Sequence, residues 1–173
     1  DEMEYLVEHK GRNNLIKNLV NDLEGNTLVL FNYVEKHGEP LYELINSTID
    51  PERKLFFVHG GTDVEDREEV RQITETESNA IIVASYGTFS TGINIKRLHN
   101  IVFASPSKSR IRNLQSIGRV LRKGEGKDIA TLYDIADDIG GQNYTLKHLN
   151  ERVNIYNDEN FKYEVIKVNL RAS

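Results

Sequence analysis

The sequence of 173 residues contains no cysteine. Disulfide bridges and thiolate metal sites are therefore excluded, and a reducing intracellular setting is compatible with this composition. The five histidines are scattered, and none shows the paired spacing that metal ligands share: His9, His37, His59, His99 and His148. We therefore expect no metal site in this chain.

Long apolar runs and linkers are also missing. No apolar stretch approaches the length of a bilayer span, so we expect no membrane partner. The acidic start, Asp1–Glu4, lacks the basic and apolar regions of a signal peptide, and the absence of an initial Met suggests a fragment of a longer protein. With only three prolines and no internal repeat, we expect a single domain over residues 1–173. Within it, residues 139–173 would form a C-terminal extension with a helix and a strand.

The formal net charge of −5 argues mildly against nucleic acid as a partner, but the charges are unevenly placed. Between Ser107 and Lys127, a single acidic residue, Glu125, opposes seven basic ones: Lys108, Arg110, Arg112, Arg119, Arg122, Lys123 and Lys127. Between Thr62 and Glu77 the balance is reversed, because seven carboxylates face Arg67 and Arg71. The first region is suited to anions, and the second predicts an acidic face in water.

Short apolar runs alternate with amphipathic stretches along the chain. The runs predict buried strands at Thr27–Phe31, Lys54–His59, Ala80–Ala84, Asn100–Ala104 and Asp128–Tyr133, with a late strand at Phe161–Val168. The stretches between them predict helices at Asn14–Leu23, Pro40–Ile45, Thr62–Thr76, Pro106–Lys123 and Tyr144–Tyr156. This alternation is typical of an α/β domain whose largely parallel sheet is covered by helices on both faces.

One helical stretch combines polar residues on a single face. In Gln115–Arg122 (QSIGRVLR), the side chains of Gln115, Arg119 and Arg122 are three or four residues apart and project together. Each arginine offers a planar fork of donors that suits a polyphosphate, and such an arginine can neutralise charge at a transferring γ-phosphate. The alternative is an ordinary basic helix in water, which explains Arg110 and Arg112 equally well.

The pattern Q-x-x-G-R-x-x-R resembles motif VI of superfamily 2 helicases. The segment Ile81–Ile95 (IIVASYGTFSTGINI) resembles motif V of the same family, with Ser85 in place of the usual Thr and Asn94 in place of the usual Asp. This resemblance implies that Ser85, Thr88 and Thr91 contact the nucleic-acid backbone. It also implies that Gly92, Asn94 and Gln115 approach the nucleotide, although the change to Asn removes a charge.

Two weaker blocks precede these motifs. Leu28–Tyr33 (LVLFNY), which includes Phe31, resembles motif IV, and His59-Gly60-Gly61 followed by Arg67 resembles the next block. The resemblance implies that Phe31 and Gly60 lie in the nucleic-acid path, where main-chain N–H groups can hold a phosphate. A Gly-Gly pair after a strand is more often a simple turn. The order and spacing of all four blocks make the resemblance specific.

The resemblance covers nearly the whole chain and is strongest to phage recombination helicases. It implies a RecA-like fold, an intracellular location in the host cytoplasm, and a motor that uses ATP and Mg²⁺ to unwind branched or duplex DNA or RNA–DNA hybrids. Arg119 and Arg122 would be arginine fingers. The chain has no phosphate loop, since Gly124–Lys127 (GEGK) lacks its spacing, and no acidic Mg²⁺-binding block. Both would belong to a first RecA-like domain, so we expect this chain alone to be inactive.

Other interpretations stay open from the sequence. The chain could be a non-catalytic helicase-like adaptor that binds nucleic acid, or a nucleotide-binding regulatory domain. Asp137 and Asp138 look like a carboxylate pair after the fifth strand, but adjacent residues do not share a helix face. We expect them in a loop or at the start of a helix.

Overall fold

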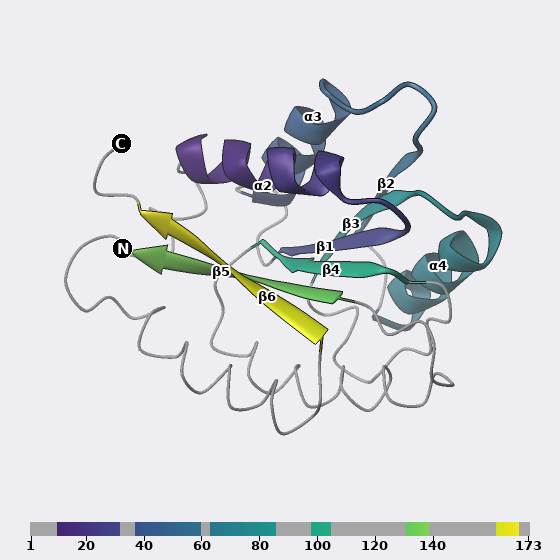
Figure 1. Ribbon diagram of the computed structural model, residues 1–173. Helices are drawn as coiled ribbons and strands as arrows, with labels where there is room; N and C mark the ends of the chain where they lie inside the picture. The colour runs from purple at the N-terminus through teal and green to yellow at the C-terminus, as the bar shows by residue number, and fades with distance from the viewer. Residues whose placement is uncertain are drawn as a thin grey trace.

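The described part of the computed structural model comprises residues 10–31, 37–59, 63–85, 98–104, 131–138 and 162–169. Its strands form one sheet in the order β2-β3-β1-β4-β5-β6, and every neighbouring pair is parallel (Figure 1). The strands are β1 (Thr27–Phe31), β2 (Leu55–Val58), β3 (Ile81–Ser85), β4 (Asn100–Phe103), β5 (Thr131–Asp138) and β6 (Lys162–Asn169). The expected α/β architecture with a parallel sheet is confirmed.

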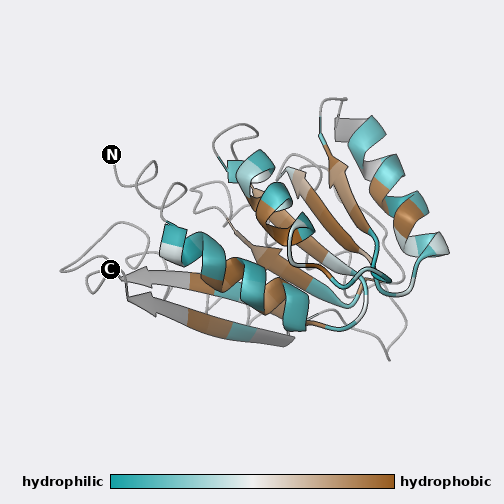
Figure 2. Ribbon diagram, turned by 90° about the horizontal axis from the view of Figure 1, so that it is seen from above, coloured by the Kyte–Doolittle hydropathy of each residue, from teal (hydrophilic) through white to brown (hydrophobic). Residues whose placement is uncertain are grey.

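Three described helices cover the two faces of this sheet. Helices α2 (Lys10–Asp22) and α3 (Glu39–Asn46) lie on one face, and α4 (Asp63–Thr76) lies on the other (Figure 1). In Figure 2 the middle strands are strongly apolar while the helices are polar on their outer sides, as expected when a sheet is buried between two layers. The helices expected at 106–123 and 144–156 lie outside the described residues.

Side chains alternate across the sheet and produce two separate apolar layers. The layer under α4 includes Leu28, Leu30, Ile82, Ala84, Ile101 and Phe103, with Val70 and Ile73 from the helix. The layer under α2 and α3 includes Val29, Phe31, Ile81, Val83 and Val102, with Ile16, Val20, Leu41 and Ile45 from the helices. The central strand β1 contributes to both layers, and all five of its residues are buried.

Most expected elements agree closely with the observed ones. Strand β1 has the predicted bounds, and α4 ends at the predicted residue, Thr76. The predicted fifth strand was too short at its end, since the strand continues past Tyr133 to Asp138, while residues 128–130 of the predicted range lie outside the described residues. Asp137 and Asp138 are therefore strand residues and not part of a loop or helix start. The reason is that β6 pairs in register along all of β5, down to Asp138 opposite Asn169.

The amino edge of the sheet is held by a polar network around the start of β1. Gly25 has a φ of 92°, and a Cβ at this position would lie 2.6 Å from Cγ of His99. This left-handed turn lets the chain leave α2 and enter the sheet. The Asn26 side chain then donates to the carbonyl of Glu77 (2.7 Å) and accepts from the N–H of Ala80 (2.9 Å), which ties β1 to the start of β3.

Arg53 is the second anchor of the amino edge. Its guanidinium donates to the carbonyl oxygens of Val20 (3.3 Å), Gly25 (3.0 Å) and Asn79 (3.0 Å), and to Oγ1 of Thr27 (3.3 Å). Partial burial lowers the pKa of Arg53. One side chain thus joins the end of α2, the turn before β1 and the turn before β3.

Candidate functional site

The carboxyl ends of the parallel strands meet at one edge of the sheet. After β1 the chain continues to β2, which lies on one side of β1 in the strand order. After β4 it continues to β5, which lies on the opposite side. Strands β1 and β4 are neighbours, so the direction of the connections reverses between them. In open α/β sheets, ligands bind beyond the carboxyl ends of strands at such a switch point. The candidate site is therefore the edge near Phe31 and Phe103.

Two of the predicted site residues lie side by side at this edge. Ser85, the last residue of β3, pairs in register with Phe31, the last residue of β1. Ser85 is half-buried, whereas Phe31 is fully buried and packs edge-on against Phe57 with ring centroids 5.6 Å apart. A Cβ added to Gly38 would come within 2.6 Å of the Phe31 ring, so that ring is closely enclosed. The structure thus encloses Phe31 in the core, where the residue has no exposed surface.

The other predicted site residues lie outside the described residues. They are Gly60, Thr88, Thr91, Gly92, Asn94, Gln115, Arg119 and Arg122. Each belongs to a segment that follows the carboxyl end of β2, β3 or β4 in the chain. The topology therefore starts these three segments at a single edge, while the contacts of the eight residues stay predictions.

A buried arginine at the same edge was missed by sequence reasoning. Arg12, in the first turns of α2, is fully buried, and its Nη1 donates to the carbonyl oxygen of Ala104, directly after β4. The two residues are 92 positions apart. A single arginine at the start of an amphipathic helix normally lies in water, so its local sequence contains no signal of this contact.

His37 and Asn13 extend this buried polar cluster toward β1. The Nε2 of His37 donates to Oδ1 of Asn13 over 3.0 Å, and neither side chain is exposed beyond 9%. Burial, together with the nearby charge of Arg12, holds the pKa of His37 well below its usual value of 6.5. The imidazole is therefore neutral near pH 7, and Arg12 carries the positive charge of this trio.

A row of aromatic rings marks the carboxyl end of the edge strand β2. Tyr42 of α3 stacks on Phe57, with ring centroids 5.2 Å apart and an interplanar angle of 17°. The ring centroids of His59 and Phe57 are 4.2 Å apart. Phe57 also contacts the buried Phe31, so the row extends from the core to the exposed His59. These contacts fix the end of β2 immediately before Gly60.

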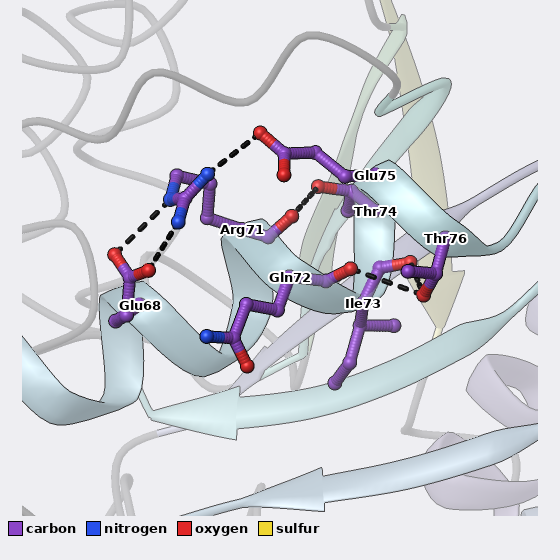
Figure 3. Close-up of polar contacts among 7 residues, drawn as sticks. All are labelled: Glu68, Arg71, Gln72, Ile73, Thr74, Glu75 and Thr76. Carbon is purple, nitrogen blue, oxygen red and sulfur yellow. Dashed lines mark hydrogen bonds and ion pairs between the residues drawn. The ribbon is translucent and has the colours of Figure 1, made fainter.

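Helix α4 presents the acidic face that the charge pattern predicted. Glu65, Glu68, Glu69 and Glu75 are exposed, and Arg71 donates to Glu68 and Glu75 (2.7 Å) one turn away on either side (Figure 3). These hydrogen bonds lower the pKa of Glu68 and raise that of Arg71. With four exposed carboxylates around one arginine, this face disfavours a nucleic-acid backbone.

The described residues present neither a metal-binding cluster nor a membrane-spanning helix. Within these ranges, no cluster of three or more histidines and carboxylates could hold a metal ion. No helix in the described part of the chain has both the length and the apolar character needed to cross a membrane.

Three comparisons relate the chain to known proteins. The model of the helicase conserved C-terminal domain matches residues 11–124, a range that includes every predicted site residue. The ATP-dependent DNA helicase uvsW of Enterobacteria phage T4 is 42% identical over 158 residues, which cover 84% of this chain and 31% of the relative. The crystal structure of T4 UvsW matches 98% of this chain with a TM-score of 0.76 and 38% identity. The chain spans 37% of that structure, so it corresponds to about a third of these relatives.

Proposed function

Because this chain belongs to the helicase conserved C-terminal domain family, we propose that it is the second motor domain of an ATP-dependent superfamily 2 DNA helicase. The observation that carries this proposal is the match over residues 11–124 together with the parallel sheet, at whose carboxyl edge the segments with the predicted motifs begin. Like its UvsW relative, the whole protein would act on DNA with ATP as its fuel. Its substrates would be branched DNA, as in branch migration during recombination and repair, and the RNA–DNA hybrids of R-loops.

In the proposed motor, this domain completes a nucleotide site whose other half lies on a first RecA-like domain of the same polypeptide. Arg119 and Arg122 reach the γ-phosphate across the cleft and stabilise the charge that develops during transfer. Gln115, Gly92 and Asn94 approach the nucleotide. ATP and Mg²⁺ would be held mainly by the first domain, and the described residues of this chain contain no carboxylate or histidine cluster that fits Mg²⁺.

The nucleic-acid path in this proposal follows the ends of β1, β2 and β3. Ser85, Thr88 and Thr91, with the main chain of Gly60, contact the sugar–phosphate backbone. Ser85 is the register partner of Phe31, and Phe31 has no exposed surface, so Ser85 is the residue of this pair that the proposal assigns to the contact. Contacts to phosphates carry little sequence information, so we expect selection by DNA structure, such as branches or hybrids, and not by base sequence.

The test is removal of each proposed finger in the complete polypeptide. In Arg119→Ala and Arg122→Ala, we expect DNA-stimulated ATP turnover to fall by on the order of 10³-fold, because transition-state charge is no longer neutralised. ATP binding, measured by titration with a fluorescent nucleotide analogue, should change little. Arg71→Ala, which removes an exposed arginine from α4, serves as the control and should keep full turnover. Turnover within twofold of wild type in both finger variants would refute the assignment.

The alternative function is a non-catalytic helicase-like module that binds nucleic acid. It is favoured by one observation, namely that these 173 residues contain no phosphate loop. The two functions differ in the rest of the polypeptide. A phosphate loop and an acidic Mg²⁺-binding block there, with DNA-stimulated ATP hydrolysis by the whole protein, support the motor, and the lack of hydrolysis supports the module.

A further inference from the structure

We infer that Arg12 is a positioning residue for the arginine fingers, because it fixes the point at which their segment leaves the sheet. This inference rests on the proposed function, since it concerns the residues that would act on the nucleotide. Residue 104 is the last one described after β4, and the segment that follows it carries Gln115, Arg119 and Arg122.

Both main-chain polar groups of Ala104 are held. Its N–H donates to the carbonyl oxygen of Leu30 in β1 over 2.9 Å, and its carbonyl oxygen accepts from Nη1 of Arg12. Ala104 and Arg12 are both fully buried, so water does not compete for either bond. Ala104, the last described residue after β4, is therefore held at a fixed position.

The contact lies at the switch point between β1 and β4, where α/β folds bind their ligands. The neighbouring Asn13 accepts from His37, the first described residue after the exit of β1. The adjacent residues Arg12 and Asn13 of α2 thus hold Ala104, which follows β4, and His37, which follows β1.

The chemistry of the side chain also points to positioning. A buried guanidinium loses solvation, and an apolar residue of similar volume would fill this space at lower cost in free energy. An apolar residue would leave the Ala104 carbonyl without its donor. The planar fork of arginine supplies a donor in a fixed geometry, whereas a lysine ammonium would be a point charge on a flexible stem.

The chain offers a matched control in Arg53. It also donates to main-chain carbonyl oxygens of distant segments, but at the amino edge of the sheet. Loss of Arg53 should weaken the fold without moving the finger segment. A comparison of Arg12→Met with Arg53→Met therefore separates positioning from general stability.

The experiment uses the complete polypeptide at a temperature where circular dichroism shows each variant to be folded. For Arg12→Met we expect kcat of DNA-stimulated ATP hydrolysis to fall about tenfold or more, because small displacements of a reacting group are costly, while KM for ATP changes less than about twofold. Arg12→Lys should recover part of kcat. Arg53→Met should keep kcat within about twofold of wild type. Equal kcat losses in Arg12→Met and Arg53→Met, or no loss in Arg12→Met, would overturn the inference.

Amide hydrogen exchange provides a second readout that does not depend on catalysis. In Arg12→Met, peptides that begin after Ala104 should exchange faster than in wild type, whereas in Arg53→Met they should not. If the wild-type polypeptide fails to hydrolyse ATP, the proposed function fails, and the exchange data still decide whether Arg12 holds the segment. If Arg12→Met does not fold, Arg12→Lys replaces it in both measurements, since it keeps the charge and lacks the fork.

Discussion

At the scale of single residues, the carboxyl edge depends on polar side chains that are enclosed within an apolar layer. Arg12, Asn13 and His37 are all buried beside the core under α2 and α3. Buried polar groups are costly unless they are hydrogen-bonded, and both Arg12 and His37 have such partners. The burial of His37 makes the stability of the fold sensitive to protonation of its imidazole.

His37 should make the stability of the protein depend on pH. Its pKa in the folded state is well below 6.5, so below pH 6.5 the unfolded chain binds a proton that the folded chain does not. The contribution of neutral His37 is thus complete above pH 6.5 and is lost as the pH falls. Between pH 6.5 and 5.5 we therefore expect the free energy of unfolding to fall.

Urea unfolding of wild type and His37→Gln at both pH values measures this contribution. The glutamine does not titrate and can still donate to Asn13, so the difference between the two proteins isolates the imidazole. His59→Gln, at an exposed position, is the control. A pH dependence that is the same in wild type and His37→Gln would show that His37 is not the source.

At the scale of elements, the inner and outer sides of helix α4 stabilise the fold in different ways. On its inner side, Ile73 packs into the apolar layer and is 7% exposed. On its outer side, Arg71 joins Glu68 and Glu75 in water (Figure 3). Removal of buried methyl groups leaves a cavity, whereas exposed ion pairs contribute little and are screened by salt.

We therefore expect Ile73→Ala to lower the free energy of unfolding by about 2–5 kcal/mol. Arg71→Ala should have a much smaller effect, and that effect should shrink further in 1 M salt. Chemical unfolding at low and high salt measures both. A large, salt-independent loss in Arg71→Ala would mean that the acidic face has a structural role beyond its ion pairs.

Strands β1 and β5 also show which predicted strand bounds depend on pairing with a neighbouring strand. Strand β1 was predicted with its observed bounds, because five consecutive apolar or β-branched residues lie between Asn26 and Asn32. The prediction for strand β5 ended at Tyr133, short of the observed end at Asp138. Its actual extent is set by pairing with β6, which a local window around residues 128–133 does not contain.

At the scale of the whole molecule, the sheet should open from its edges. Strand β1 is paired on both sides and buried throughout, whereas β2 and β6 are the outer strands of the described sheet. In β2 only Val58 is fully buried, and the described side chains of β6 are partly buried or exposed. Local openings cost least where few apolar contacts are lost. We expect amides of β1 and β3 to exchange more slowly than those of β2 by on the order of tenfold or more.

Hydrogen exchange followed by mass spectrometry of peptides from each strand tests this order. The comparison of β1 with β2 is direct, because both are short parallel strands of the same sheet. Equal protection of β2 and β1 would indicate that the edge at β2 is covered in solution.

The sequence by itself determined the alternation of elements and the family. Both are local properties, because a buried strand is a short apolar run and each motif lies within a window of about fifteen residues or fewer. The acidic face of α4 followed in the same way from its composition.

Only the tertiary structure decided which side chains meet. It buried Arg12 against Ala104, 92 residues away, and it turned the ring of Phe31 into the core beside Phe57. It also extended β5 along β6. Each of these outcomes is a contact between segments that are far apart in the chain, and the free energy of such a contact depends on how the layers pack and not on the residues on either side.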